Sequence, residues 1–367
     1  MNLSSHRVAT STRHRLAAFA AFTVIGLGAC SDSTNPAESF DPTAASQATA
    51  SVLATFADNP ALDALDILQT ALPNFTPAPV APAGDLPLPD GGTLAELRAL
   101  DRLLAFPAPG ASAALFPADL LGTTLVYNTT TQQYEVDPAA TGAPANGLRI
   151  VLYAVDPVFH DPVEPLNAIG YLDVTDESTA AADQVGIVAV IGDVTYIDYL
   201  GSATVFTDGV TFTAAGFLSD GTTVLDFNLD HSYSAADGFT LTYDVGAHPV
   251  GVTTPTTTVL AAVHLDPNLQ TASYSLAVEH QGESVALDIT GSDTAISGVV
   301  SHNGATVAEI SGTPDQPAFT DADGNPLTNE QVQSLGELFI GITAIISGFD
   351  VLLIPAYLVL QVSLAMV

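Results

Sequence analysis

Beyond residue 122 the chain alternates hydrophobic and polar residues, a pattern typical of β-strands that bury one face. The alternation predicts strands at 123–128, 132–136, 148–155 and 169–174, and further strands follow at short, even intervals past residue 184. Pairs that tolerate the positive φ angles of tight hairpin turns separate such runs. These pairs are Asp208-Gly209, Asp220-Gly221, Asp237-Gly238 and Asn303-Gly304. The pattern therefore predicts a large antiparallel meander and not a parallel α/β sheet.

The predicted sheet has one apolar face and one wetted face. In one strand Leu225, Phe227 and Leu229 share a face, and acidic or amide side chains share the other. The same alternation recurs at 239–245 and 273–279. We expect a set of apolar residues from these strands to line a cavity for an apolar ligand: Leu225, Phe227, Leu229, Leu241, Tyr243, Tyr274 and Leu276. An apolar face of this length has to be covered by other elements.

Helical periodicity precedes the strands. Residues 43–57 and 60–71 carry apolar stripes that are interrupted at Asn59-Pro60. A proline-rich stretch follows, and then a shorter helix is predicted at 93–106.

The end of the chain supplies the predicted cover for the apolar face. Thr328 and Gln331 form a capping-box pattern, which marks a helix start, and from residue 338 to 367 the only charged residue is Asp350. Pro355 is expected to divide this segment into two helices, although the part after it could also form a strand. A transmembrane segment at 351–367 is the alternative. Burial is favoured, because no basic residue flanks that segment.

The predicted fold class is mainly β with α, an α+β fold in which helices cover a meander sheet that could curl into a half-barrel. The expected organisation has five parts along one main domain: a signal peptide at 1–29, a tether at 30–50, a helical and proline-rich region at 51–121, the antiparallel β domain at 122–327 and the hydrophobic C-terminal helices at 328–367.

The N-terminus has the plan of a secretory signal peptide, with a basic start, an apolar stretch at 16–27 and small residues before Cys30, the only cysteine. Leu27-Gly28-Ala29-Cys30 resembles the lipobox of bacterial lipoproteins. That resemblance implies cleavage before Cys30 and acylation of its thiol, which would anchor the protein in a membrane. Ser31 implies the outer membrane, so a cell-envelope location facing the periplasm or the cell surface is expected. An ordinary secretory signal with an incidental cysteine is the alternative.

The net charge of the chain limits the classes of partner that it can bind. There are 40 acidic and 6 basic residues, which give a formal net charge of −34. Such a surface repels phosphate backbones, so nucleic acid is excluded as a partner. The acids recur singly along strands and turns, which favours solubility and loose attraction of Ca²⁺ or Mg²⁺. No other cofactor is expected.

Candidate metal ligands occur at two places. Asp156, His160, Asp161 and Glu164 lie within nine residues and could bind a hard cation or zinc, although the intervening prolines suggest a stiff acidic loop. Residues 319–330 imitate a calcium loop, but the first position is Phe319. A turn leading into a helix is the better interpretation there.

Three histidines continue the apolar face towards the rim of the sheet: His231, His280 and His302. If neighbouring strands align, these rings could bind a metal or respond to pH. Ordinary packing also places amphipathic rings at the end of an apolar face.

No catalytic, phosphate-binding or dinucleotide motif is present, and the mature chain resembles no family of known function. A lipid anchor, a one-sided meander and apolar helices together resemble the half-barrel carriers and chaperones of lipids and lipoproteins in bacterial envelopes. The first functional expectation is therefore a non-catalytic binding or scaffold role, with a lipid or apolar small molecule held between sheet and helices. A cation-stabilised acidic surface protein is the alternative, and a hydrolase is the third.

Overall fold

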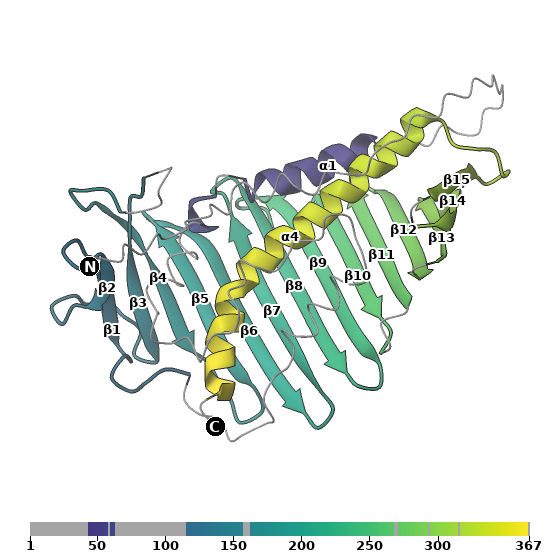
Figure 1. Ribbon diagram of the computed structural model, residues 1–367. Helices are drawn as coiled ribbons and strands as arrows, with labels where there is room; N and C mark the ends of the chain where they lie inside the picture. The colour runs from purple at the N-terminus through teal and green to yellow at the C-terminus, as the bar shows by residue number, and fades with distance from the viewer. Residues whose placement is uncertain are drawn as a thin grey trace, which may run out of the picture.

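The computed structural model describes residues 43–57, 59–62, 115–156, 162–267, 271–292, 294–314 and 316–365. In this part of the chain a fifteen-stranded sheet carries two helices, α1 and α4, and α4 crosses the sheet diagonally (Figure 1). The helices are α1 (Thr43–Ala54) and α4 (Asn329–Ala365). The strands are β1 (Thr123–Asn128), β2 (Gln133–Val136), β3 (Gly147–Tyr153), β4 (Ala168–Asp176), β5 (Asp183–Ile191), β6 (Val194–Phe206), β7 (Gly209–Ser219), β8 (Thr223–Ser234), β9 (Gly238–Pro249), β10 (Thr257–Leu265), β11 (Thr271–His280), β12 (Glu283–Ser292), β13 (Ile296–His302), β14 (Ala305–Thr313) and β15 (Gln316–Asp321).

The sheet is a meander, as the alternation predicts. From β3 to β15 each strand pairs antiparallel with the next one along the chain, and β2 and β15 form the two edges of an open sheet. One pair departs from the prediction: β1 runs parallel to β3, because the β1–β2 hairpin places β2 outside and the chain then returns beside β1. The predicted turn at Asn303-Gly304 has φ angles of 51° and 79°, which suit the tight hairpin between β13 and β14.

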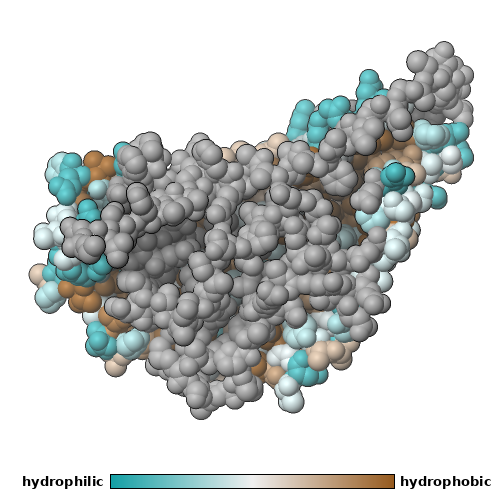
Figure 2. All heavy atoms as spheres, viewed as in Figure 1, coloured by the Kyte–Doolittle hydropathy of each residue, from teal (hydrophilic) through white to brown (hydrophobic). Residues whose placement is uncertain are grey.

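The two faces of the sheet differ as the sequence predicts. In β8 the residues Leu225, Phe227 and Leu229 are buried, whereas Asp226 and Asn228 between them are exposed. The same alternation of buried and exposed positions runs through β9, β10 and β11. Seen from the side of the helices, hydrophobic and hydrophilic residues are both visible around the margin of the molecule (Figure 2).

Helix α1 begins at Thr43, inside the segment assigned to the tether, and its chain turns at Asn59 as predicted. The Asn59 side chain donates to the carbonyl of Thr55 and to that of Ser219 in β7, both at 2.9 Å. Its Oδ1 accepts the backbone N–H of Ala61, which is the bond of a helix N-cap. One side chain thus ends the first helix and fastens it to the sheet. Of the predicted helix at 60–71 only residues 60–62 are described, and the one at 93–106 lies outside the described residues.

Helix α4 begins with the predicted capping box: Gln331 Oε1 accepts the backbone N–H of Thr328, and Thr328 Oγ1 accepts that of Gln331. The predicted division at Pro355 is wrong, because α4 continues without a break for 37 residues. A proline frees a carbonyl one turn before it and pushes that turn outward. The carbonyl that Pro355 leaves without its helical partner is that of Val351, and the phenol of Tyr199 donates to the adjacent carbonyl of Leu352 at 2.9 Å, so the sheet contacts the backbone of that turn. Tertiary packing therefore lets the helix pass through the proline.

The two helices approach each other closely. A Cβ on Gly341 would lie 2.5 Å from Thr49 of α1, and one on Gly348 would lie 2.8 Å from Phe56. The Phe349 ring sits between Phe56 and Phe227 of β8, with both pairs of ring centroids 5.1 Å apart. Glycines seven residues apart therefore let α1 nest against α4, and phenylalanines join both helices to the sheet.

Candidate functional site beneath helix α4

The candidate site is the contact between α4 and the buried face of the central strands. Helix α4 packs against β5, β6 and β10, and it meets β7 and β8 through ring contacts. The helix comes close to β6, where a Cβ on Gly201 would lie 2.9 Å from the Cβ of Ala356. The Tyr199 hydroxyl donates to α4 beside this point, and burial raises the pKa of this phenol, so the group stays neutral.

A second polar contact joins α4 to the sheet at His231 of β8. The Nδ1 atom of His231 lies 2.5 Å from the Tyr357 hydroxyl of α4. Rings of Phe212 from β7 and Tyr243 from β9 surround the imidazole, with centroids 6.2 and 5.3 Å away. Phe212 stacks on Tyr357 at 4.2 Å. The imidazole of β8 is thereby enclosed by aromatic side chains from two neighbouring strands and one helix.

The surroundings of His231 determine its charge. The residue is 6% exposed, and burial lowers the pKa of its imidazole from 6.5 to about 4. The ring is therefore neutral at pH 7. Its Nε2 atom is buried, and none of the described residues gives it a hydrogen-bond partner. The site can thus offer one neutral hydrogen-bonding nitrogen inside an apolar layer.

The residues predicted to line a cavity lie together on this face. Six are buried and Tyr274 is partly buried, and all seven belong to or pack against one apolar cluster with α4: Leu225, Phe227, Leu229, Leu241, Tyr243, Tyr274 and Leu276. Burial raises the pKa of the Tyr274 phenol. Their shared face is confirmed, and their role in ligand binding stays a prediction.

The opposite face carries a shallow hollow of about 300 Å³ over β8 to β11. Its lining includes Asp230, Asp244 and the side chain of Leu260, which is 46% exposed. Burial within the wetted face raises the pKa of the Asp230 carboxyl. This hollow is open and of mixed polarity, and it lies across the sheet from α4.

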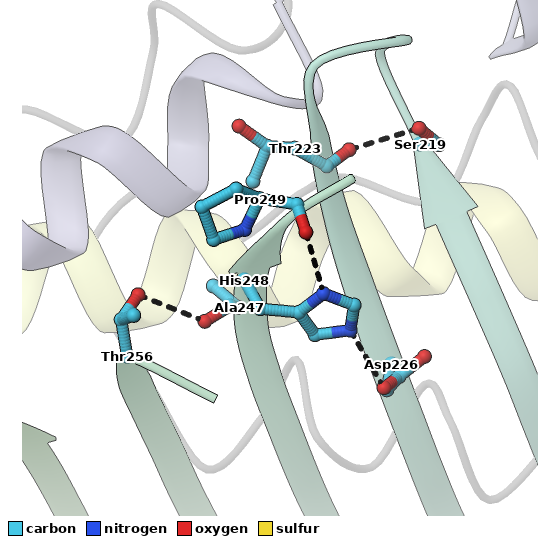
Figure 3. A network of polar contacts seen from close by, with 7 residues as sticks. All are labelled: Ser219, Thr223, Asp226, Ala247, His248, Pro249 and Thr256. Atoms are coloured by element: carbon cyan, nitrogen blue, oxygen red, sulfur yellow. Dashed lines mark hydrogen bonds and ion pairs between the residues drawn. The ribbon is translucent and has the colours of Figure 1, made fainter. Parts of the chain in front are cut away.

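A histidine and a carboxylate meet at one end of the sheet. His248 of β9 donates from Nδ1 to the carbonyl of Pro249 at 3.0 Å and from Nε2 to the Asp226 carboxylate at 2.9 Å (Figure 3). Burial lowers the pKa of this imidazole, but the bonds to Pro249 and Asp226 outweigh burial and raise the pKa above 6.5. Both ring nitrogens are occupied, so this pair has no free base to activate a hydroxyl nucleophile.

The predicted metal ligands are only partly placed. His160 and Asp161 lie outside the described residues, whereas Asp156 and Glu164 are described. Within the described ranges no group of three or more histidine, cysteine or acidic side chains is arranged to hold a metal ion.

The turn interpretation of residues 319–330 is confirmed. Asp321 Oδ1 accepts the backbone N–H groups of Asp323 and Asn325 at 3.0 and 2.8 Å, and helix α4 follows.

The three rim histidines have different surroundings: His231 is buried, whereas His280 bonds to the Thr257 hydroxyl at 2.8 Å and His302 lies near Asn303.

Sequence reasoning missed the two tyrosines that join the sheet to α4. Tyr199 lies in a strand that alternates as predicted, so the sequence pattern could predict that its side chain is buried. The pattern could not predict its hydrogen bond to a helix carbonyl. Tyr357 lies two residues after Pro355, where the sequence left helix and strand open. Their partners are 153 and 126 residues away in sequence, and no local pattern encodes such pairs.

Helix α4 also passes a test of length and composition for crossing a membrane over Asn329–Phe349, and a third of its most apolar window is buried in the structure. Comparisons of the chain with protein-family models, with curated proteins and with solved structures give no match.

Proposed function

We propose that this protein is a membrane-anchored envelope lipoprotein that binds an acyl chain or a similar apolar ligand between its sheet and helix α4, without catalysis. The observation that supports this proposal most strongly is the way in which α4 is attached to the sheet. Hydrogen bonds through Tyr199 and Tyr357 join it to the sheet. Apolar side chains such as Phe349 and Leu353, both of which are fully buried, supply much of the other contact.

Apolar attachment suits a cover that can exchange partners. Hydrophobic contacts are non-directional, so an acyl chain can replace part of the surface that α4 buries with little loss of free energy. The sheet provides a long apolar face, since buried positions recur on every strand from β5 to β11. In this proposal the open sheet acts as a half-barrel and α4 acts as its lid.

The anchor forms the second part of the proposal. Acylation of Cys30, which lies outside the described residues, would hold the apolar face near a source of lipid. Two or more acyl chains give a stable anchor, at about 0.8 kcal/mol for each buried CH₂. Mass spectrometry of the N-terminal peptide tests this part. Acyl masses on Cys30 are expected, whereas an unmodified cysteine contradicts the anchor and leaves ligand binding untouched.

Ligand binding is tested by native mass spectrometry of the full chain carrying Cys30→Ser, released gently and without added lipid. A bound lipid that appears in the organic extract after denaturation is expected. A clean apo mass, together with no uptake of added palmitic acid, contradicts the proposal.

A second candidate function is an acidic surface protein stabilised by divalent cations. It is favoured by the carboxylates of Asp226, Asp230 and Asp244, which the wetted face carries on the neighbouring strands β8 and β9. A melting temperature that rises steeply with Ca²⁺ supports it, because binding to the folded state alone stabilises that state. A melting temperature unchanged by Ca²⁺ and Mg²⁺ contradicts it.

A further inference from the structure

His231 is a buried polar side chain whose hydrogen-bonding capacity is half used. Its Nδ1 is bonded to the Tyr357 hydroxyl, and its Nε2 is buried with no partner in the described part of the chain. Buried polar atoms in folded proteins are nearly always paired, so an unpaired one calls for a specific explanation. Replacement of this histidine by a purely apolar side chain would have satisfied packing alone.

The tautomer of His231 follows from the acidity of its partner. A phenol O–H is a much stronger acid than the N–H of a neutral imidazole, so the Tyr357 hydroxyl donates and Nδ1 accepts. The single ring proton of the neutral imidazole is therefore on Nε2. The group left without a partner is a donor, and it needs an acceptor atom.

The surroundings of this donor limit the kind of acceptor that fits. Every described ring near His231 is aromatic and uncharged: Phe212, Tyr243 and Tyr357. No charged group contributes to the pKa of this imidazole among the described residues. A neutral acceptor oxygen attached to a hydrocarbon chain suits such a setting, because it satisfies the N–H and its chain contacts the apolar face.

We propose that the Nε2–H of His231 donates to the carbonyl oxygen of a bound acyl chain and so positions the polar end of the ligand beneath α4. This inference rests on the proposed function and adds a binding residue and a ligand class to it. The carbonyl can come from an acyl ester or from a fatty acid that binds in its protonated form. A plain hydrocarbon lacks the acceptor and gains only the apolar contacts.

The test compares three probes of matched chain length on the full chain carrying Cys30→Ser: palmitic acid, methyl palmitate and hexadecane. Affinities are measured by displacement of the neutral fluorophore N-phenyl-1-naphthylamine. At least one carbonyl probe should bind about 10-fold or more tightly than hexadecane, as expected for one buried hydrogen bond. Preference for both carbonyl probes indicates an ester-tolerant site, and preference for the acid alone indicates a free fatty acid.

Two amide variants of His231 test the roles of its two ring nitrogens separately. His231→Asn retains an amide near the position of Nδ1 and removes the Nε2 donor, so it should lose the preference while still binding hexadecane. His231→Gln places an amide N–H near the position of Nε2 and should keep part of the preference. His264→Asn is the matched control, because His264 is exposed on β10, two strands away in the sheet, and bonds to Thr240.

The outcomes distinguish the two proposals. Equal affinity of the wild-type protein for all three probes overturns the role of His231 and leaves the apolar site standing. Binding of none of them contradicts the proposed function itself. An Asn variant that folds, binds hexadecane and retains the full preference for a carbonyl also overturns the role of His231.

Discussion

Replacing His231 by phenylalanine should remove a loss of stability that the wild-type protein suffers on acidification. Burial lowers the pKa of this imidazole from 6.5 to about 4 in the folded protein. Between these two pH values the unfolded chain binds more protons than the folded one, so the free energy of unfolding falls as the pH falls. Each pKa unit corresponds to about 1.4 kcal/mol, which gives a total loss of about 3 kcal/mol by pH 4.

Phenylalanine retains the ring that packs among Phe212, Tyr243 and Tyr357, so the variant tests charge more than shape. It leaves the Tyr357 hydroxyl without its bond to Nδ1, and that cost is the same at every pH in this window. The carboxyls of Asp198 and Asp230 have pKa values raised by burial and act in the opposite direction. Both carboxyls are present in wild type and variant, so their effect cancels in the difference.

The assay is urea unfolding at constant ionic strength from pH 4 to pH 8. The difference in unfolding free energy between wild type and His231→Phe should change by about 3 kcal/mol across this range, in favour of the variant at low pH. His264→Phe, at an exposed position on the opposite face, is the control for the exchange of a histidine for phenylalanine as such. Parallel curves for wild type and His231→Phe would refute the assignment of a buried neutral imidazole.

Three further predictions concern other contacts. His248→Gln should flatten the alkaline side of the stability profile, because the pKa of His248 is raised in the fold and its stabilisation is lost as the pH rises through that raised value; an unchanged slope above pH 6.5 speaks against the ion pair. Gly348→Ala should destabilise by about 1–3 kcal/mol in urea unfolding, since its Cβ meets Phe56, whereas Gly336→Ala, with nothing within 4 Å, should be neutral or stabilising. Tyr199→Phe should cost about 0.5–1.5 kcal/mol by removing the hydrogen bond from the sheet to the Leu352 carbonyl; a melting temperature equal to that of the wild type would show that the bond contributes nothing.

Local patterns predicted most of the fold. Alternation placed the strands because a half-buried strand repeats every two residues, and the hairpin pairs marked turns such as Asn303-Gly304. The capping box at Thr328 and Gln331 marked the first turn of α4, since both of its hydrogen bonds lie within three residues. These signals need no knowledge of distant parts of the chain.

Features that depend on distant residues were not predictable. Pro355 would end an isolated helix, and α4 continues because packing on the sheet, including the Tyr199 hydroxyl, stabilises the turn before it. The glycines of α4 look like weak helix positions in sequence, yet Gly341 and Gly348 allow the close approach of α1. The buried face of the candidate site was readable from alternation, whereas the bond between His231 and Tyr357 required the path of α4 across β8.

The most direct test of the account is native mass spectrometry of the full chain carrying Cys30→Ser, before and after organic extraction. We expect a complex with a lipid that is lost on denaturation, and a complex that forms again when palmitic acid is added to the refolded protein. An apo mass that stays unchanged with added palmitic acid would show that α4 fills the apolar face permanently, and would contradict a ligand site between the sheet and its helix.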